Sequence, residues 1–541
     1  MASPRSSSLL AVWVALGAAM LAGLGQQAVW IAQDRDRLVT TTIYEDAFYY
    51  FQTSRNLARG HGAVSSGGIA HNGFHPLWMV LCAISFWAGD GLRGPGGAGD
   101  GSLGAIRVIL GFGAILGALT TLAIYGILRG LGCGRFASAF AAVCFQMNPY
   151  MLGLSTSGLE APLNALLLAT TLLWILRPGR GRMGRAHCLA LGILFGLVFL
   201  VRTDNAFFLA ATWIALAWRA RWDRRARLWL LFSAGVALLV TLPWWIWNLH
   251  RFGSPMQGSA SALPVVREIA FFERNPGASA GDLFWRRCGL FLGWHGWFPA
   301  ALMYSGLGSV WYLMFAALAA ALFTRDGRRE SPRLGLALLD LVPLLVAVVC
   351  LGFAHRFIRL ATREWYYVTS DVCLALVWGA FVHFLLTVLP GKRARTAAIA
   401  LMVCLAGGML ARKTTANWRD RLSRPRAYAL EVLDAMESVE DTTPDESFGA
   451  TDSGALGFFA SRPVINLDGV VNPEAARAVR EGRLLDYVEK KGIRRVVITP
   501  RMANERILGK GFRERLGPFP SLTAQGYEVK PRGPSGAVPA P

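Results

Sequence analysis

The feature that most constrains this chain is its succession of long apolar blocks, most of them roughly 17–25 residues long and separated by short charged segments. An α-helix of that length crosses the hydrocarbon core of a bilayer, which is about 30 Å thick. Apolar residues make up 54% of the 541 residues, and charged residues only 16%. A soluble protein carries about a quarter charged residues. The sequence therefore predicts an α-helical polytopic membrane protein.

The formal net charge of +21 does not indicate a nucleic-acid partner, because the arginines stand in short clusters between apolar blocks, where membrane topology explains them. The eight cysteines form no CxxC pair and lie mostly inside apolar blocks, so they predict neither a disulfide framework nor a zinc site. Lysine is scarce beside the many Arg, Ala and Gly residues, a bias typical of GC-rich bacterial genes. The bilayer is therefore expected to be the bacterial cytoplasmic (inner) membrane.

The orientation follows from the concentration of Lys and Arg on the cytoplasmic side of membrane proteins. The basic clusters are Arg129 with Arg135; Arg177, Arg180, Arg182 and Arg185; Arg219 to Arg227; Arg325 to Arg333; and Lys392, Arg393 and Arg395. Placing all of them inside requires two spans between successive clusters. The apolar blocks nearly supply these spans, at about 136–153 and 160–176, 187–201 and 205–218, 228–248 and 298–323, and 334–354 and 368–390.

Three further spans complete the expected topology. The run from about Leu9 to Ala32 is too long for the core of a signal peptide and is expected to remain as the first span. A second span is expected at about 103–128 and a last one near 396–411. The prediction is thus about eleven spans, with the amino end in the cytoplasm and the carboxyl end outside.

One apolar block is too short to cross. The block from Pro76 to Gly89 is shorter than the roughly 17–25 residues that a spanning helix needs. If it crossed, every later loop would invert and the arginine clusters would face outward. We therefore predict that this block is a helix lying in the outer membrane interface.

This topology leaves a first loop (about 33–102), a loop at 249–297 and a C-terminal tail on the outer face. From Arg412 the tail is charged and combines a helical stretch with short strand-like runs, which predicts a small α/β domain. These stretches are Tyr428–Met436, Phe448–Thr451, Val464–Leu467 and Arg495–Thr499. The expected parts are a transmembrane domain at 1–411, an extracytoplasmic α/β domain at 412–530 and a disordered end at 531–541.

The first outer loop holds the most informative polar residues. Two adjacent carboxylates, Glu45 and Asp46, stand amid aromatic residues, and His71, Asn72 and His75 follow just before Pro76-Leu77-Trp78. A carboxylate at a membrane boundary can take a proton from an attacking hydroxyl, with its pKa tuned by partial burial. The alternative is structural, with helix capping by an acid and interfacial anchoring by Tyr and Trp. The residues alone leave both interpretations open.

The order of these strings resembles the GT-C superfamily of membrane glycosyltransferases, which includes bacterial arabinosyl- and mannosyltransferases and protein O-mannosyltransferases. Its members begin with a span, continue with an outer loop that opens on an acidic pair, and then have a His/Asn-Pro-Leu-aromatic stretch that starts an interfacial helix. Further strings extend the resemblance along the chain: Ser157-Gly158-Leu159-Glu160, Val201-Arg202-Thr203-Asp204, Thr451-Asp452-Ser453-Gly454-Ala455-Leu456-Gly457 and Asp468-Gly469-Val470-Val471-Asn472.

The resemblance implies a GT-C-like fold and a reaction. A sugar on a polyprenyl-phosphate donor would be transferred, with inversion, to a hydroxyl of an acceptor glycan, lipid or protein on the extracytoplasmic face. A first-loop acid would be the general base. The family commonly has Asp where this chain has Glu45, and we favour Asp46. Glu160 would orient the acceptor or a divalent cation, or would simply be a partner of a helix dipole.

A lipid-phosphate leaving group should meet cations at the outer surface. The string from Arg359 to Tyr367, with Arg363 and Tyr366, clusters basic and aromatic residues on a face that should be poor in charge. It can also anchor the next span by snorkelling. Arg202 and Asp204 are expected to bind substrate or, alternatively, to pair with each other. Other outer-face candidates are His75, Arg251, His355 and Arg356.

Three other functions compete. A transporter or flippase should have ionisable residues deep within its spans and often internal repeats, whereas the acids here crowd the outer loops, with Asp340 the main exception. A membrane-anchored binding module needs only one or two spans. A polymerase or ligase of lipid-linked glycans shares the expected chemistry and remains open. The sequence has no Walker-type phosphate loop, so cytoplasmic nucleotide-sugar use has no support.

Overall fold

The computed structural model describes residues 4–91, 102–176, 184–255, 257–360, 363–440, 447–499, 502–518 and 526–529. Arg177, Arg180 and Arg182 of the second basic cluster, and the end expected to be disordered, lie outside the described residues. The chain folds into two compact units. Unit 1 comprises Met1–Gln33, Arg107–Trp244 and Cys288–Arg424, and unit 2 comprises Asp34–Ile106, Trp245–Arg287 and Pro425–Pro541.

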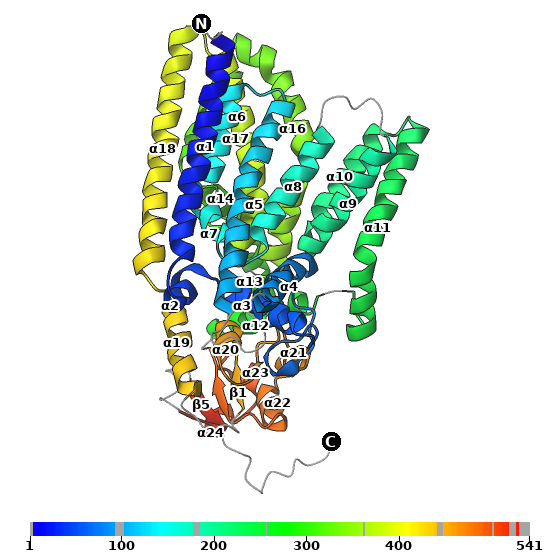
Figure 1. The fold of residues 1–541 in the computed structure, drawn as a ribbon, viewed down its shortest axis with the longest axis vertical. Coiled ribbons are helices and arrows are strands. Elements are labelled where there is room, and N and C mark those ends of the chain that lie inside the picture. Colours follow the sequence, from blue (N-terminus) through cyan, green and yellow to red (C-terminus); the bar gives the residue numbers. More distant parts are fainter. Residues whose placement is uncertain are drawn as a thin grey trace. The chain divides into compact units, whose positions relative to one another are not determined.

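Unit 1 is built of helices, many of which run side by side (Figure 1). Its elements are α1 (Pro4–Ile31), most of α5 (Ser102–Gly130), α6 (Arg135–Gln146), α7 (Pro149–Ser155), α8 (Ala161–Leu176), α9 (Arg185–Val201), η3 (Thr203–Asn205), α10 (Ala206–Arg219), most of α11 (Arg224–Phe252), α14 (Trp297–Tyr304), α15 (Val310–Leu322), α16 (Arg325–Gly352), η4 (Phe353–Ile358), η5 (Glu364–Tyr367), α17 (Val368–Val388) and α18 (Gly391–Ser423).

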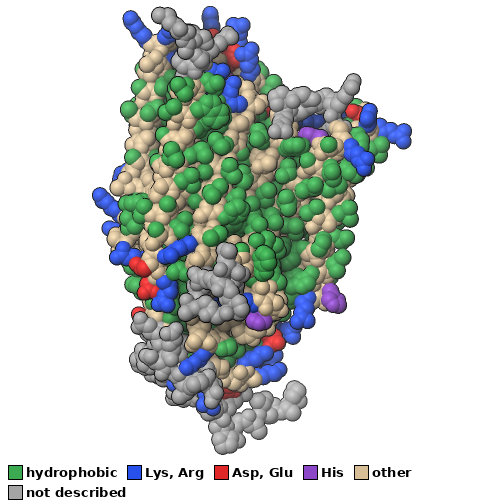
Figure 2. Space-filling model, in the orientation of Figure 1, with side chains coloured by type: hydrophobic (Ala, Val, Ile, Leu, Met, Phe, Trp, Pro, Cys, Tyr) green, Lys and Arg blue, Asp and Glu red, His purple; other side chains and the backbone are tan. Residues whose placement is uncertain are grey.

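Six helices among the described residues are long and apolar enough to cross a membrane: Leu9–Ile31, Ser102–Gly130, Arg224–Phe252, Arg325–Ile358, Glu364–Val388 and Gly391–Ser423. Shorter apolar helices include Pro76–Gly89, Ala161–Leu176, Arg185–Val201 and Val310–Leu322. Figure 2 shows hydrophobic side chains over much of the visible helical surface, as contact with lipid requires. The α-helical polytopic fold is confirmed, and the count of about eleven spans stays a prediction.

Two stretches expected as single spans are each divided into two helices. The stretch at 136–153 divides where Asn148 Oδ1 accepts a hydrogen bond from Tyr150 N at 3.1 Å and Pro149 starts α7. An Asn cap followed by a proline without an N–H starts a new helix rather than continuing the old one. The stretch at 298–323 divides at Gly306 and Gly308, which both have positive φ. The last helix, α18, continues to Ser423, beyond the expected domain start at Arg412.

Unit 2 combines short helices with a sheet. Its elements are α2 (Arg35–Arg37), η1 (Leu38–Thr42), α3 (Glu45–Ala58), η2 (Ser66–Gly68), α4 (Pro76–Gly91), α12 (Ser259–Arg274), most of α13 (Ala280–Leu292), α19 (Ala427–Glu440), β1 (Phe448–Ala450), α20 (Gly454–Phe459), β2 (Val464–Asn466), α21 (Pro473–Arg480), α22 (Leu484–Lys490), β3 (Arg495–Val497), α23 (Glu505–Leu508), α24 (Phe512–Arg515), β4 (Leu516–Pro518) and β5 (Gly526–Val529).

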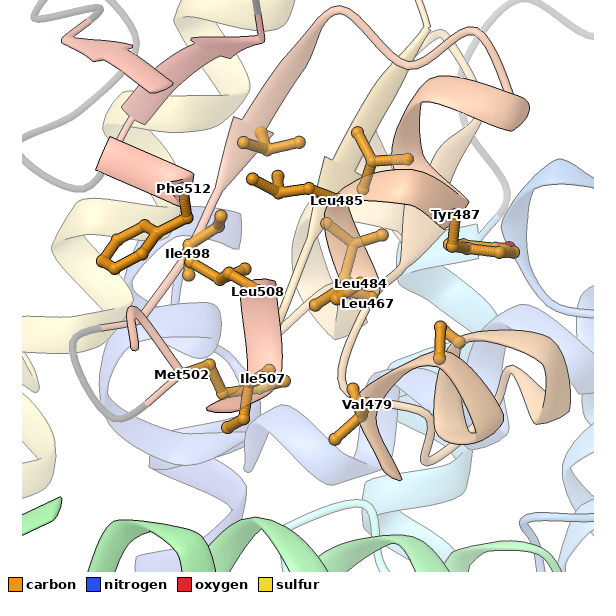
Figure 3. Packing of buried hydrophobic residues seen from close by; sticks show 14 of the residues in the cluster. Leu467, Val479, Leu484, Leu485, Tyr487, Ile498, Met502, Ile507, Leu508 and Phe512 are labelled. Atoms are coloured by element: carbon orange, nitrogen blue, oxygen red, sulfur yellow. The ribbon is translucent and has the colours of Figure 1, made fainter. Parts of the chain in front are cut away.

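The sheet of unit 2 has the strand order β2-β1-β3-β5-β4. Strand β1 is parallel to β2 and β3, with Phe448 opposite Val464 and Arg495, whereas β5 is antiparallel to β3 and β4. The three strand-like runs of the sequence are β1, β2 and β3, so the predicted sheet-containing C-terminal region is confirmed. Figure 3 shows its apolar core, in which Leu467, Leu484 and Ile507 are fully buried.

The helix of the first loop, α3, packs against α20 of the C-terminal region. The side chain of Gln52 is buried, donates from Nε2 to the carbonyl oxygens of Ser453 (3.1 Å) and Gly454 (2.5 Å), and accepts from Ser66 N at 3.1 Å. Arg55 Nη2 donates to Phe458 O at 2.8 Å, and its guanidinium lies 4.0 Å from the centroid of the Phe458 ring. The first loop and the C-terminal region thus share one packed core within unit 2.

Replacement of Gln52 by Leu should therefore destabilise unit 2. The change leaves a buried amide and two carbonyl groups without this partner, and each such loss costs about 1–3 kcal/mol. We expect a lower midpoint of thermal unfolding in detergent and faster proteolysis within 425–541. Gln26→Leu, at a half-buried position of α1, is the matched control and should change neither. Equal melting of Gln52→Leu and the wild type would contradict this account of the α3–α20 contact.

Candidate functional site

The residues predicted to carry function fall into two sets, one within each unit. Unit 2 holds the first-loop residues Glu45, Asp46, His71, Asn72 and His75. Unit 1 holds Glu160, Arg202, Asp204, Arg359, Arg363 and Tyr366.

The acidic pair lies in the first turn of α3, and both side chains are partly buried. Neither acid caps its own helix, because the N-cap residue is Tyr44 and no side chain bonds there. Instead, Glu45 Oε1 accepts a hydrogen bond from Ala455 N, at the start of α20, at 3.0 Å. A Cβ on Gly454 would lie 2.5 Å from Glu45 O, so this approach requires glycine. Glu45 therefore joins the first loop to the Ser453-Gly454-Ala455 string.

Two C-terminal acids complete a cluster around this pair. Asp452 follows β1 and Asp468 follows β2. These strands are parallel neighbours, so their carboxyl ends lie at one edge of the sheet. Asp468 Oδ1 accepts from Val470 N at 2.9 Å, and Tyr49 Oη accepts from Ser453 N at 3.3 Å. The sequence singled out the strings that contain Asp452 and Asp468, but not the acids themselves as site residues.

Burial and mutual repulsion change the acidity of this cluster. Burial raises the pKa of Glu45 to about 8, with the charges of Asp452 and Asp46 adding to the rise and the hydrogen bond from Ala455 opposing it. Burial and the charge of Asp452 likewise raise the pKa of Asp468 to about 7. Near neutral pH, Glu45 is thus held mainly in its protonated form, which distinguishes it from an ordinary surface carboxylate.

The histidine and asparagine of the first loop are held by internal bonds. His71 is buried, its Nδ1 accepts from Gly73 N at 3.2 Å, and its Nε2 lies 3.0 Å from Thr53 Oγ1. Burial lowers the pKa of His71 to about 3, so the ring is neutral. Asn72 donates to Asn248 Oδ1 and accepts from Gly258 N, both at 2.9 Å. These contacts fix the end of the long helix α11 and the segment after it.

His75 binds the same segment. Its Nδ1 lies 3.3 Å from Gln257 Nε2, which also donates to Phe74 O. The substrate-binding role expected for His71, Asn72 and His75 stays a prediction, and each of them also has a supporting role within unit 2.

In unit 1, Arg202 stands at the centre of a buried ion network. Its Nη1 donates to Glu160 Oε1 at 2.5 Å, and its Nε and Nη2 donate to the two oxygens of Asp204 at 3.0 and 2.7 Å. His355 Nε2 lies 3.0 Å from Asp204 Oδ2. Burial alone would raise the pKa of Asp204, but the charge of Arg202 and the hydrogen bond to His355 hold it well below its usual value. Arg202 and Asp204 therefore pair with each other, and Arg202 also pairs with Glu160.

The aromatic part of the Arg359–Tyr367 string joins this network. The ring of Tyr366 stacks on His355 with 3.9 Å between centroids, and the Arg202 guanidinium lies 5.7 Å from the Tyr366 ring. Arg356 donates from Nε to Tyr367 Oη at 3.0 Å. Arg359 is half-buried, whereas Arg363 is exposed and lies over the ring of Trp365 at 5.5 Å. Arg251 belongs to unit 2, where it is exposed at the end of α11.

Sequence reasoning missed an acid within a span. Asp371 of α17 is 2% exposed, and neither of its oxygens has a hydrogen-bond partner within the described part of the chain. It lines a cavity of about 10 Å³ together with Asn148 and Ser305. Asp340, the acid that the sequence singled out, is partly exposed and pairs with Arg219 Nη2 at 2.6 Å. The available signal was a lone acid in the apolar stretch after Tyr367.

A divalent cation was the one cofactor that the family resemblance suggested. Among the described residues, no three His, Cys, Asp or Glu side chains are grouped so as to hold a metal ion. A metal requirement therefore stays a prediction.

A helical membrane unit, combined with a first-loop acidic pair that packs on a small sheet-bearing region, defines an integral membrane protein with the GT-C fold. Solved structures confirm this fold. The archaeal oligosaccharyltransferase AglB from Archaeoglobus fulgidus, in complex with an inhibitory peptide and a dolichol-phosphate, matches over 90% of this chain and 69% of its own, with 15% identity and a TM-score of 0.57.

Two further structures agree with this one. ArnT from Cupriavidus metallidurans bound to undecaprenyl phosphate matches over 92% of this chain and 94% of its own, with 15% identity and a TM-score of 0.51. The arabinofuranosyltransferase AftD from Mycobacteria matches over 91% of this chain and 36% of its own, with 19% identity and a TM-score of 0.50.

Sequence families match two parts of the chain. Residues 103–247 match the family described as dolichyl-phosphate-mannose-protein mannosyltransferase. Residues 419–532 match a family described as a domain of unknown function. No curated protein matches the chain. The GT-C resemblance read from the motifs is thus confirmed by the fold and by a family match in the membrane unit.

The pKa values of the acidic cluster predict how stability depends on pH. A carboxyl whose pKa rises from 4.5 to about 8 keeps a proton that the unfolded chain releases, so the folded state loses stability as the pH rises through that window. The slope is at most about 1.4 kcal/mol per pH unit for each such group. Glu45→Gln should reduce the fall in melting midpoint between about pH 5 and about pH 8.

The matched control is Glu505→Gln, which removes an exposed carboxylate of unit 2 and should leave the slope unchanged. An unchanged slope in Glu45→Gln would show that Glu45 does not keep its proton in the folded protein.

Loss of Arg202 should be far more costly than loss of a surface arginine. Arg202→Met leaves two buried carboxylates without their cation, a change that costs about 3–5 kcal/mol. Arg424, whose pair with Asp420 is exposed, provides the comparison, and Arg424→Met should cost about 0–1 kcal/mol. Thermal unfolding in detergent measures both. Similar melting midpoints for the two variants would contradict a structural role of the Arg202 network.

Proposed function

We propose that this protein is a glycosyltransferase that transfers a sugar from a polyprenyl-phosphate-linked donor to a hydroxyl of an acceptor glycan, lipid or protein. The observation that carries the proposal is the GT-C fold with two adjacent carboxylates at the start of α3. The match of residues 103–247 to dolichyl-phosphate-mannose-dependent transferases supports it. So do the dolichol-phosphate and undecaprenyl phosphate bound in two of the similar structures.

Asp46 is the general base of this proposal. Glu45 is held by Ala455 N, and its pKa of about 8 leaves it mainly protonated at neutral pH, so it is poorly suited to accept a proton. Asp46 takes the proton of the acceptor hydroxyl as the hydroxyl oxygen attacks the anomeric carbon. The bond from that carbon to the phosphate oxygen breaks, and the polyprenyl phosphate leaves with its electron pair. Attack from the opposite face inverts the anomeric centre.

Arg359 and Arg363 are the proposed ligands of the donor phosphate. They are the first and last residues of the connection from η4 to η5, and Arg363 is exposed. Guanidinium forks match phosphate oxygens and stabilise the charge that develops on the leaving group. Arg202 is proposed as a positioning residue instead, because three of its five N–H groups already bond to Glu160 and Asp204. Glu160 then acts by holding Arg202, and Tyr366 by stacking on His355.

The proposed setting is the bacterial cytoplasmic membrane, with the amino end inside and the C-terminal region on the outer face. Six helices of spanning length support the membrane location, and the basic clusters between helices support the orientation. The reaction would then take place outside the cell membrane, where nucleotide sugars are absent and lipid-linked donors are needed.

The test is transfer from radiolabelled polyprenyl-phosphate sugars, both pentoses and hexoses, by purified protein supplied with envelope glycan and lipid acceptors. Loss of a general base lowers the rate by about 10²–10⁴-fold, and we expect this for Asp46→Asn. Glu45→Gln should retain more activity than Asp46→Asn, because it keeps a neutral acceptor for Ala455 N. Arg359→Ala and Arg363→Ala should raise KM for the donor more than they lower kcat.

Asp36→Asn is the matched control, since Asp36 is an exposed acid of the same outer loop. The melting midpoint of each variant shows that it is folded. Full activity in Asp46→Asn would overturn the base assignment. Turnover of oligosaccharide donors but not of single-sugar donors would instead assign the polymerase or ligase class.

A further inference from the structure

Unit 1 contains a cavity that the proposed reaction does not use. Its volume is about 430 Å³, within the range of pockets that hold small ligands. Its walls are the turn between α5 and α6, the first half of α16 and the last turns of α17. Residues of all three elements belong to unit 1.

The cavity lies far from the Arg202 network. Arg333 lines the cavity, while His355 of the network follows the end of α16. At about 1.5 Å per residue, the helix from Arg333 to Gly352 is about 28 Å long, nearly the thickness of the hydrocarbon core. The cavity lining on α16 therefore begins near the end opposite the network, the end that carries the Arg325 to Arg333 cluster.

The polar lining offers both acceptors and donors. The carboxylate of Glu330 is bound by Arg333 Nη1 at 2.7 and 3.0 Å, and Asp340 is bound by Arg219 at 2.6 Å. Each carboxylate oxygen can accept more than one hydrogen bond, so both acids still have acceptor capacity. Arg333 is largely exposed and retains further N–H groups.

His383 adds a neutral donor. Its Nδ1 accepts a hydrogen bond from Gly134 N at 3.2 Å, so the ring proton of the neutral imidazole is on Nε2. Nε2–H is the donor that His383 offers as it lines the cavity.

The remaining lining is apolar. Leu334, Leu336 and Phe384 line the cavity, and Leu336 is exposed on α16. A ligand that fits this combination carries a charged head and a hydrocarbon chain, which is the chemistry of a membrane lipid.

We propose that this cavity binds a glycerophospholipid with a phosphoethanolamine headgroup. The phosphate accepts hydrogen bonds from Arg333 and from His383 Nε2–H, and the primary ammonium donates to the carboxylates of Glu330 and Asp340. An acyl chain follows the leucines of α16. A purely anionic head would face two carboxylates, and a phosphocholine head has no N–H with which to bond them. The mixed charges of the lining therefore select this zwitterion.

The test is native mass spectrometry of the full-length protein with phosphatidylethanolamine, phosphatidylcholine or phosphatidylglycerol that have identical acyl chains. Hydrogen bonds to charged groups distinguish these heads, so the ethanolamine lipid should bind about tenfold more tightly than the other two. Glu330→Gln removes a negative charge from the lining. It should lower the affinity for phosphatidylethanolamine by about tenfold and raise the affinity for phosphatidylglycerol. A variant that had merely unfolded would lose affinity for both lipids, and could not gain affinity for one of them. His383→Gln should weaken the binding of phosphatidylethanolamine and of phosphatidylglycerol.

Asp326→Asn, at an exposed acid in the first turn of α16 that does not line the cavity, is the matched control and should change nothing. Soluble glycerophosphoethanolamine tests the need for acyl chains and should compete poorly. Equal binding of the three lipids, or unchanged preference in Glu330→Gln, would overturn the proposal. If soluble glycerophosphoethanolamine competes with the same affinity as the lipid, the proposal is also overturned, because the cavity would then bind a free phosphodiester.

Discussion

The hydrocarbon core of a bilayer offers no hydrogen-bond partner, so the polar groups of the helical unit must find partners inside the protein. The backbone does this by forming helices. Ionised side chains do it by pairing, and the Arg202 network is the clearest case. One guanidinium bonds both to Glu160, in the turn before α8, and to Asp204 of η3, and His355 then binds Asp204 from the end of α16. Three separated segments are thereby joined by charges that are too costly to bury alone.

Asp371 shows the other solution to the same constraint. It is buried in α17 without a hydrogen-bond partner among the described residues, and an ionised carboxylate in such surroundings is strongly disfavoured. The cavity beside it has room for about one water molecule. Paired charges and an isolated acid thus occur in the same bundle. The paired charges hold segments of the chain together. The protonation of the isolated acid depends on its immediate surroundings.

The acidic cluster of unit 2 follows a different logic, because the charges of Asp452 and Asp46 repel the charged form of Glu45. Glu45 binds the amino end of α20, and Asp452 and Asp468 follow two adjacent parallel strands. The repulsion is tolerated because burial keeps a proton on part of the cluster. Two neighbouring carboxyl groups of α3 consequently have different tasks in the proposed reaction. Glu45 connects the loop to the C-terminal region, and Asp46 is left as the base.

Local patterns were sufficient to predict much of this protein from its sequence. The lengths of the apolar blocks indicated a membrane-spanning helical protein, and short strand-like runs marked β1, β2 and β3, because both properties depend on neighbouring residues alone. The order of the motifs indicated the GT-C fold. Tertiary structure decided the contacts between distant segments: the bonds of Arg202 to Glu160 and of His355 to Asp204, the bond from Ala455 N to Glu45, and the burial of Asp371 without a hydrogen-bond partner among the described residues. These contacts depend on which side chains meet after folding. A local pattern along the chain does not show which distant residue a buried side chain will contact.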